Sequence, residues 1–270
     1  MRPQLESQRF LGPESDAIFA ATTAGVIGLG GGGSHVAQQI AHLGIGTVIP
    51  VDPDIIEHKN LNRLVGGTFK DVKKKRPKVE IAERTIKGIN PDAIVIPKKS
   101  LWQNQQMLLR ASTAIFGCVD SYRERDELER FCRRFLIPYI DIGMDVHQTA
   151  SGYTLGGQVV LSTPGNPCLR CLGIVTDERI RREAARYGAA GSRPQVVWIN
   201  GVLASLAVGL FVQVVTPWHG HPVGSACCEF DGNGHLVESN RIKHLEGVVC
   251  RHYPATEVGD PFFMREDRAA

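Results

Sequence analysis

A glycine-rich segment carries the first chemical signal in this sequence. Gly28-Leu-Gly30-Gly-Gly-Gly33 fits the pattern G-x-G-x-x-G and lies between an apolar run and a helical pattern. Glycines let backbone amides approach a phosphate, and the N-terminus of a following helix offers free N–H groups and the positive end of its dipole. We therefore take Gly28, Gly30, Gly31 and Gly33 as candidate nucleotide-binding positions.

Charged side chains follow this turn at spacings that suit a triphosphate. Asp52 comes 24 residues after Gly28, where a carboxylate can bind ribose hydroxyls. Arg63 and Lys78 add positive charge suited to a triphosphate and its pyrophosphate leaving group. Asp120 ends another apolar run, where a carboxylate can hold the Mg²⁺ that accompanies ATP. Taken one at a time, Arg63 and Lys78 would be interpreted as solvated surface charges. Because they occur in sequence between Asp52 and Asp120, we instead favour a nucleotide-binding site.

The elements that must position these residues alternate along the first half of the chain. Apolar runs predict strands at 24–29, 47–51, 93–97, 113–119 and 137–142. Helical patterns lie between them, at 34–43, 79–87 and 122–135. Such alternation predicts an α/β fold with a Rossmann-like, doubly wound, mainly parallel sheet and right-handed crossovers.

The pattern changes after Gly143. Residues 146–162 alternate like antiparallel strands, and residues 223–238 form a predicted hairpin around the turn 231–234. We expect a polar, helical N-terminal segment at 1–23, an ATP-binding half at 24–143 and a mixed-strand half at 144–270. The two halves are expected to form one continuous domain.

Composition limits the class of protein. The chain has 270 residues, 43% of them hydrophobic, and a net charge of +3, which excludes a disordered protein and gives no reason to expect DNA binding. Residues 196–215 are long enough to span a membrane, but their polar and small residues favour a buried core helix. The N-terminus lacks the apolar core of a signal peptide. We therefore expect a cytoplasmic protein that does not bind membranes.

Several ordered motifs resemble the ThiF/MoeB/HesA superfamily of ubiquitin-activating-type adenylating enzymes. They are GLGGGGSHVAQQIAHLGIGTVIPVDPDIIEHKNLNRLVG, KRPKVE, INPDA, GCVDS and PYIDIG. The resemblance implies an enzyme that uses ATP and Mg²⁺ to adenylate the C-terminal glycine carboxylate of a ubiquitin-like or sulfur-carrier protein. It also implies a homodimer.

The resemblance assigns roles to individual residues. It places Asp52 at the ribose, Asn60 and Arg63 at the phosphates, Lys78 at the phosphates in the transition state, and Asp120 at Mg²⁺. Asp54, in the same motif as Asp52, joins the nucleotide-binding candidates. Members of the superfamily also use an arginine near the N-terminus that reaches into the partner subunit's site, and Arg9 is the candidate here.

A cysteine pair predicts a metal site. Cys168-Leu-Arg-Cys171 has the spacing that supplies half of a tetrahedral zinc site. Members of the superfamily often complete it with a second C-x-x-C, and here that place holds Cys250-Arg-His252. The resemblance thus implies a structural zinc site with Cys250 and His252, and Cys227 or Cys228 in reserve. The alternative is a degenerate, metal-free site.

The segment 172–195 has no cysteine, although superfamily members that form a thioester or persulfide carry their nucleophile there. We therefore expect the acyl-adenylate to pass to another protein's thiol, sulfur donor or amine, with a thioester on this chain as the alternative. Residues 170–193 are rich in arginine, which suits either a segment that covers the carrier's C-terminal tail or a solvated helix. The arginines are Arg170, Arg179, Arg181, Arg182, Arg186 and Arg193.

Three other functions remain open at this point. A related enzyme could adenylate a peptide or a substrate of tRNA modification. A nicotinamide-dependent dehydrogenase would share the glycine turn, but Arg63, Lys78 and Asp120 together disfavour it. A non-catalytic scaffold subunit of an activating complex would be expected to lose phosphate-binding residues, which this chain keeps.

Overall fold

An eight-stranded sheet forms the centre of the protein. The structure is a computed structural model that describes residues 3–185, 194–221, 223–239, 241–245, 247–253 and 255–259. The strands are β1 (Thr23–Ile27), β2 (Thr47–Val51), β3 (Ile94–Val95), β4 (Ala114–Gly117), β5 (Tyr139–Thr149), β6 (Gly152–Ser162), β7 (Ala226–Asp231) and β8 (Leu236–Glu238). They lie in the order β3-β2-β1-β4-β5-β6-β7-β8.

The first five strands are parallel, as the alternation of elements predicts. β1 pairs with β2 on one side and with β4 on the other, so the chain reverses its direction of winding between them. This is the topology of doubly wound nucleotide-binding folds, in which ligands bind beyond the carboxyl ends of the strands at the reversal. β3 is shorter than predicted, yet Ile96 and Lys98 still donate backbone hydrogen bonds to the carbonyl groups of Val48 and Pro50.

The remaining strands are antiparallel and continue the same sheet. β5 and β6 form a long hairpin in which Tyr139 pairs with Ser162 and Thr149 with Gly152. β5 therefore runs through Gly143, where the sequence pattern changes, and no break in the sheet marks that position. β7 pairs with β6, and β8 pairs with β7, which confirms the predicted C-terminal hairpin.

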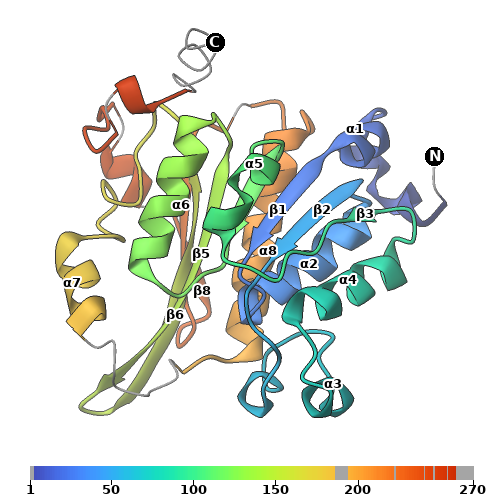
Figure 1. The fold of residues 1–270 in the computed structure, drawn as a ribbon. Helices are drawn as coiled ribbons and strands as arrows, with labels where there is room; N and C mark the ends of the chain where they lie inside the picture. The colour runs from blue at the N-terminus through green and yellow to red at the C-terminus, as the bar shows by residue number, and fades with distance from the viewer. Residues whose placement is uncertain are drawn as a thin grey trace, which may run out of the picture.

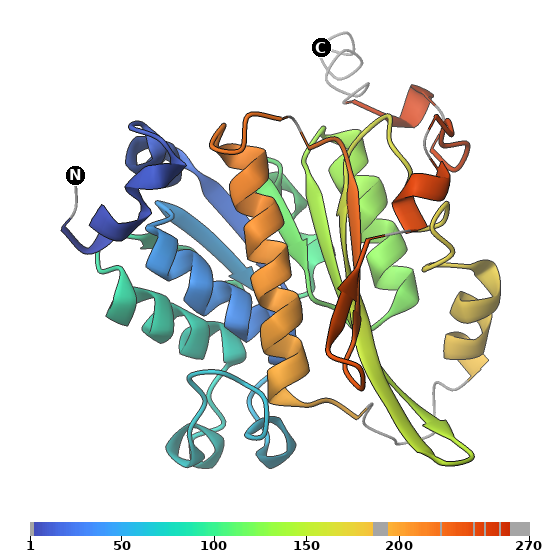
Figure 2. The ribbon, with the colours of Figure 1, turned by 180° about the vertical axis from the view of Figure 1, so that it is seen from behind.

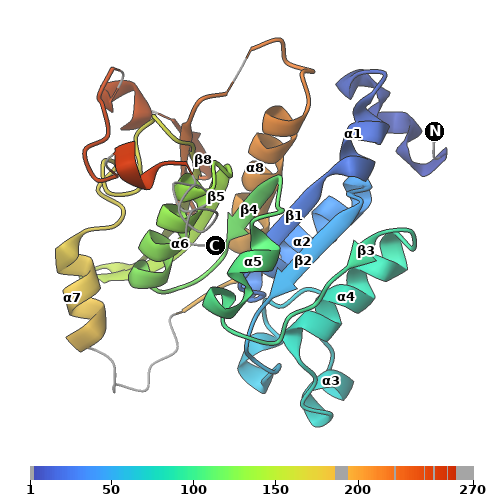
Figure 3. The same ribbon diagram turned by 45° about the horizontal axis from the view of Figure 1, so that its top comes forward.

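Helices cover both faces of the sheet (Figures 1, 2 and 3). α2 (Gly31–Leu43), α4 (Lys78–Ile89) and α8 (Val197–Val215) lie on one face, and their apolar residues share a core with β1. α5 (Gln106–Leu109) and α6 (Tyr122–Arg134) lie on the other face. The shorter elements are the 3₁₀ helices η1 (Pro3–Leu11), η2 (His58–Asn60), η3 (Trp102–Gln105), η4 (Arg241–Leu245) and η5 (Ala255–Glu257), with the α-helices α1 (Ser15–Ala21), α3 (Phe69–Lys73) and α7 (Asp177–Ala185).

α8 is the apolar segment that matches a membrane span in length. By length and composition it is a candidate span, with 44% of its most apolar window buried. Leu203, Ala207 and Phe211, spaced by four residues, are fully buried against the sheet and α2. The helix thus packs as a core helix in this fold, which supports that interpretation of the sequence.

Candidate nucleotide site and cysteine cluster

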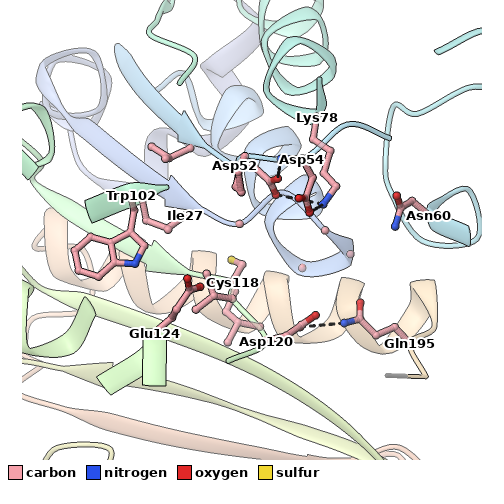
Figure 4. A pocket seen from close by; sticks show the side chains of 18 of the residues that line it. Ile27, Asp52, Asp54, Asn60, Lys78, Trp102, Cys118, Asp120, Glu124 and Gln195 are labelled. Atoms are coloured by element: carbon pink, nitrogen blue, oxygen red, sulfur yellow. Dashed lines mark hydrogen bonds and ion pairs between the residues drawn. The ribbon is translucent and has the colours of Figure 1, made fainter. Parts of the chain in front are cut away.

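A cleft opens where the carboxyl ends of β1, β2 and β4 meet (Figure 4). The sheet brings together most of the predicted site at this point, although the residues come from segments far apart in the sequence. The predicted residues that line the cleft are Gly28, Gly30, Gly31, Asp52, Asp54, Asn60, Arg63, Lys78 and Asp120.

The glycine turn needs glycine at specific positions. Gly28 has φ +84°, and a Cβ there would lie 2.6 Å from the carbonyl oxygen of Cys118. α2 begins at Gly31 rather than at the predicted Ser34, so the glycines form its first turn. A Cβ on Gly33 would lie 1.9 Å from the Gly28 oxygen. Gly33 therefore permits close packing of the helix on the turn, whereas Gly30 and Gly31 face the cleft.

Asp52 is held rigidly at the end of β2. One carboxylate oxygen accepts a hydrogen bond from the Leu29 amide at 2.7 Å, and the other accepts one from the Asp54 amide at 2.8 Å. Burial raises the pKa of Asp52, and the nearby Lys78 opposes this effect. The two backbone bonds fix the carboxylate beside the glycine turn, where a ribose would lie.

Lys78 begins α4 and points into the cleft between two carboxylates. Its Nζ lies 2.7 Å from Asp54 Oδ2 and 3.5 Å from Asp52 Oδ2. The Lys78 side chain is 10% exposed and that of Asp54 is 63% exposed. Asp54 thus holds a nearly buried ammonium group at the cleft, where it could meet a phosphate.

Asn60 and Arg63 come from the loop between β2 and α4. Asn60 Oδ1 accepts a hydrogen bond from the Glu57 amide at 2.9 Å, which closes η2. Arg63 Nη1 donates to the Lys59 carbonyl at 2.7 Å and to Asn62 Oδ1 at 2.9 Å, while its buried Nε has no hydrogen-bond partner among the described residues. Both side chains line the cleft, and Asn60 lies on the same side as Lys78 (Figure 4).

Asp120 follows β4 at the opposite wall of the cleft (Figure 4). Its Oδ1 accepts a hydrogen bond from Gln195 Nε2 at 3.1 Å, and Asn62 Nδ2 donates to the Gln195 carbonyl at 3.2 Å. Gln195, which sequence reasoning missed, therefore bridges the two sides of the cleft. No local motif marks it, because its partners lie 75 and 133 residues away.

The end of the cleft away from Lys78 contains two more residues that sequence reasoning missed. Trp102, at the start of η3, and Glu124, in the first turn of α6, both line it. Their positions after β3 and after Asp120 were the available signal, since both follow carboxyl ends of parallel strands.

Arg9 does not line this cleft. It lies on η1, where its guanidinium is 3.5 Å from Glu6 and more than half exposed. The N-terminal segment lies near the start of β1, at the other end of the sheet from the cleft (Figure 1). Contact with a partner subunit's site therefore stays a prediction for Arg9.

Cys168, Cys171, Cys250 and His252 come together in one cluster, with all four ligand atoms within 4.8 Å of one another. His252 Nδ1 lies 3.4 Å from each of the first two sulfur atoms and 3.9 Å from that of Cys250. A tetrahedral zinc ion with bonds of about 2.0–2.3 Å needs ligand atoms about 3.4–3.8 Å apart. The donor set and its spacing therefore fit zinc.

The two reserve ligands are not part of this cluster. Cys227 and Cys228 lie on β7, and burial raises the pKa of both thiols. Burial also raises the pKa values of Cys118 and Cys132. Thiols with raised pKa values are poor nucleophiles at neutral pH.

A buried network on α6 holds the loop that carries the first cysteine pair. Glu129, which is fully buried, accepts hydrogen bonds from the Leu169 amide at 3.1 Å and from the Tyr253 hydroxyl at 3.0 Å. Arg133 Nη2 donates to Ser162 Oγ at 2.8 Å. α6 thus contacts both segments that supply the cluster.

Some of the arginines within and after the first cysteine pair are already paired within the chain. Arg170 makes two hydrogen bonds to Asp126, at 2.7 and 2.9 Å, and a third to Asp177. The guanidinium of Arg179 lies over the Tyr122 ring. Arg186 and Arg193 lie outside the described residues, so their predicted role is untested.

A doubly wound sheet with a glycine turn, a buried aspartate and a buried lysine at the carboxyl ends of its strands is the arrangement found in nucleotide-binding folds. The ThiF family model matches residues 2–247, and the chain belongs to the ThiF family. This confirms the resemblance seen in the sequence motifs.

Relatives agree with the family. The chain is 28% identical over 231 residues to the sulfur carrier protein ThiS adenylyltransferase of Escherichia coli, covering 83% of this chain and 84% of that protein. It is 30% identical over 164 residues to the SAMP-activating enzyme E1 of Haloferax volcanii, covering 60% of this chain and 57% of that protein. The match to the SAMP-activating enzyme spans just over half of that protein's length.

Solved structures share the fold. Escherichia coli MccB, crystallised with ATP, has a TM-score of 0.69 and 20% identity, covering 90% of this chain and 72% of that one. MccB with MccA-N7isoASN has a TM-score of 0.71 and 20% identity, covering 90% of this chain and 73% of that one.

Proposed function

We propose that this protein uses ATP and Mg²⁺ to adenylate the C-terminal glycine carboxylate of a ubiquitin-like or sulfur-carrier protein. The observation that carries the proposal is the convergence of Asp52, Lys78 and Asp120 with the first turn of α2 in one cleft. The relatives' names, which include adenylyltransferases acting on a sulfur carrier, supply the substrate class.

The chemistry follows from charge. A carboxylate oxygen of the carrier attacks the α-phosphorus of ATP, a new P–O bond forms, and the bond to the bridging oxygen of the pyrophosphate breaks. The attacking group and ATP are both anionic, so the cleft must offset their repulsion and the charge of the leaving group. Lys78, Arg63 and the amides at the start of α2 provide positive charge for this purpose.

Asp120 is the residue that would hold Mg²⁺. Its carboxylate lies across the cleft from Lys78, and carboxylates are preferred ligands of this ion. When bound, Mg²⁺ offsets the negative charge of the phosphates and of the departing pyrophosphate. General acid–base catalysis is not required, because a carboxylate is already ionised near neutral pH.

Zinc is the second ion in the proposal, and its role is structural. The three thiols and His252 would form a closed tetrahedral site without an open position for a substrate. We further propose a homodimer in the cytoplasm, and transfer of the acyl-adenylate to a thiol or sulfur donor on another protein.

ATP–pyrophosphate exchange tests the adenylation step. With ubiquitin-like proteins that end in glycine as substrates, we expect exchange that depends on the terminal glycine. Asp120→Ala should lower the rate by about 100-fold or more, because charge compensation at the phosphates is lost. Asp92→Ala, a change of an exposed aspartate outside the cleft, is the control and should leave the rate unchanged.

Three outcomes would contradict the proposal. Full exchange activity in Asp120→Ala would remove that residue from the site. ATP binding without exchange, with any carrier, would favour a peptide or an RNA-modification substrate instead, and failure to bind ATP would favour a scaffold subunit.

A further inference from the structure

A loop beside the cleft carries a concentration of positive charge. Residues 70–76, Lys-Asp-Val-Lys-Lys-Lys-Arg, contain five cationic side chains and one aspartate, in a chain whose net charge is only +3. Lys70, Lys73, Lys74 and Lys75 are exposed, and none of their side chains forms an ion pair or hydrogen bond among the described residues. We call these four residues the lysine patch. Clustered like charges repel one another, so the patch does not stabilise the fold.

The aspartate of this segment does not neutralise the patch, because it is buried and bonded inside the protein. Asp71 Oδ1 accepts a hydrogen bond from Arg76 Nε at 2.8 Å, and each of its oxygens accepts one from Arg84 at 2.8 Å. The hydrogen bonds from Arg84 hold the pKa of Asp71 well below its usual range. This buried network fixes α3 as a rigid support for the lysines around it.

Lys75 occupies a position at which helices usually carry glycine. α3 ends in a Schellman motif, in which the Arg76 amide donates to the Asp71 carbonyl and the Lys75 amide to the Val72 carbonyl, both at 3.0 Å. Lys75 has φ +47°, a left-handed conformation that is unfavourable for a residue with a Cβ. A lysine at a strained position indicates a use for its charge.

The base of the same loop is part of the nucleotide cleft. The Ile56 amide donates to the Arg76 carbonyl at 2.9 Å, and the Lys78 amide donates to the Asp54 carbonyl at 3.0 Å, so residues 54–78 leave and return at one point. α3 and the η2 segment lie side by side at the end of the molecule where β1 and β2 finish (Figures 1 and 2). A protein bound to the lysine patch would therefore lie beside the phosphate end of the cleft.

An exposed aromatic ring and an open groove connect the patch to the cleft. Phe69, the first residue of α3, is 68% exposed, and its ring centroid lies 6.2 Å from that of His58. His58 lines a groove that also contains Tyr153 and that shares Arg63 and Gln195 with the cleft. A continuous surface thus leads from the lysine patch to the phosphate site.

The charges around the patch favour a folded protein over a nucleic acid as its partner. Glu57 lies 3.0 Å from Lys59 in the loop before the patch, and Glu80 lies 3.0 Å from Arg76 on α4 after it. These acids limit the positive surface, whereas a nucleic-acid backbone needs a longer track of positive charge. A compact basic surface with an exposed aromatic ring complements an acidic protein face that carries an apolar spot.

We propose that the lysine patch and Phe69 bind the folded body of the carrier protein through an acidic face, from which the carrier's C-terminal glycine reaches the cleft along the groove. This inference rests on the proposed function, because it assumes that the substrate is a carrier protein. The patch speeds the encounter and raises the affinity for the carrier, and it takes no part in the chemistry at the phosphates.

Exchange kinetics with the carrier as the variable substrate test this proposal. ATP–pyrophosphate exchange is measured at saturating ATP, with the ubiquitin-like protein that supports the fastest exchange. Lys70→Glu combined with Lys74→Glu should raise KM for the carrier by about tenfold or more and leave kcat and the affinity for Mg·ATP unchanged. The wild-type KM should also rise with salt. Lys87→Glu combined with Lys243→Glu, at exposed lysines outside the patch, is the control with the same change in charge.

A second variant separates carrier binding from stability. Glycine adopts the left-handed conformation readily, so Lys75→Gly should unfold at the same or a higher urea concentration than wild type while KM for the carrier rises. A residue with only a structural role would change the two quantities together. A carrier variant with acidic surface residues changed to lysine should restore a low KM with the charge-reversed enzyme.

The outcomes separate the two proposals. If wild type shows no exchange with any carrier, the proposed function fails, and carrier binding at the patch fails with it. If exchange occurs but the charge-reversed variant raises KM no more than its control, carrier binding at the patch is wrong while the proposed function stands. The same conclusion follows if the reversal instead weakens binding of labelled oligouridylate, measured by fluorescence anisotropy, or changes the oligomeric state, because the patch would then bind RNA or a second copy of the chain.

Discussion

Asp52 illustrates how much one side chain contributes to the cleft. Both of its oxygens accept backbone hydrogen bonds, from the amides of Leu29 and Asp54. Asp52→Asn would place an amide donor against one of these N–H groups, so we expect a loss of about 1–3 kcal/mol in the free energy of unfolding. Urea denaturation measures it, and Asp92→Asn, at an exposed position, should change little. If the two variants were equally stable, the backbone hydrogen bonds to Asp52 would not contribute to stability as we expect.

The sequence predicted the residues that follow strand ends and missed those that depend on distant partners. Asp52 and Asp120 were recognisable because strands and their carboxyl ends can be located from apolar runs. Trp102 and Glu124 carry no motif, and their shared environment exists only after β3 and α6 have packed on the sheet. Gly33 fits the glycine pattern, but its contact with Gly28 shows a packing role.

At the scale of elements, α6 connects the sheet to the cysteine cluster. Its buried Glu129 bonds the Leu169 amide and the Tyr253 hydroxyl. Glu129→Gln would place an amide donor among these groups and would remove the negative charge that faces buried Arg133. We therefore expect a loss of about 3 kcal/mol in the free energy of unfolding. We also expect weaker retention of zinc, although no ligand is changed.

The matched control for this prediction lies on the same helix. Glu127 is exposed, and Glu127→Gln should leave both the unfolding midpoint and the zinc content unchanged. Denaturation curves and metal analysis on the same preparations make the comparison. If Glu129→Gln behaved like Glu127→Gln, the network would not support the cluster.

The boundaries of elements were predicted less well than their existence. α2 starts three residues earlier than predicted because Gly31 to Gly33 are helical, although glycine is a poor helix former. Charged residues make up most of α6, a composition typical of exposed helices. Arg125 and Glu129 are instead buried, with partners on β5 and on the cysteine loop. Pairings over such distances cannot be derived from local patterns.

At the scale of the whole molecule, the cysteine cluster joins the C-terminal segment to the rest of the protein. Cys168 and Cys171 follow β6, whereas Cys250 and His252 lie more than 80 residues along the chain from Cys168. We expect one zinc ion per chain, and we expect Cys250→Ser to lose it. The melting temperature should then fall by about 10 °C, because zinc binding contributes several kcal/mol to such folds.

Limited proteolysis shows which part of the molecule loosens when zinc is lost. In Cys250→Ser, or after chelation, cleavage should begin in residues 241–259, while the sheet and Mg·ATP binding persist, because the cleft shares no residue with the cluster. Cys228→Ser, which alters a cysteine on β7 outside the cluster, should keep both zinc and stability. Wild-type protein without zinc, or equal destabilisation by Cys228→Ser, would show that hydrogen bonds such as those of Tyr253, rather than a metal, hold the C-terminal segment in place.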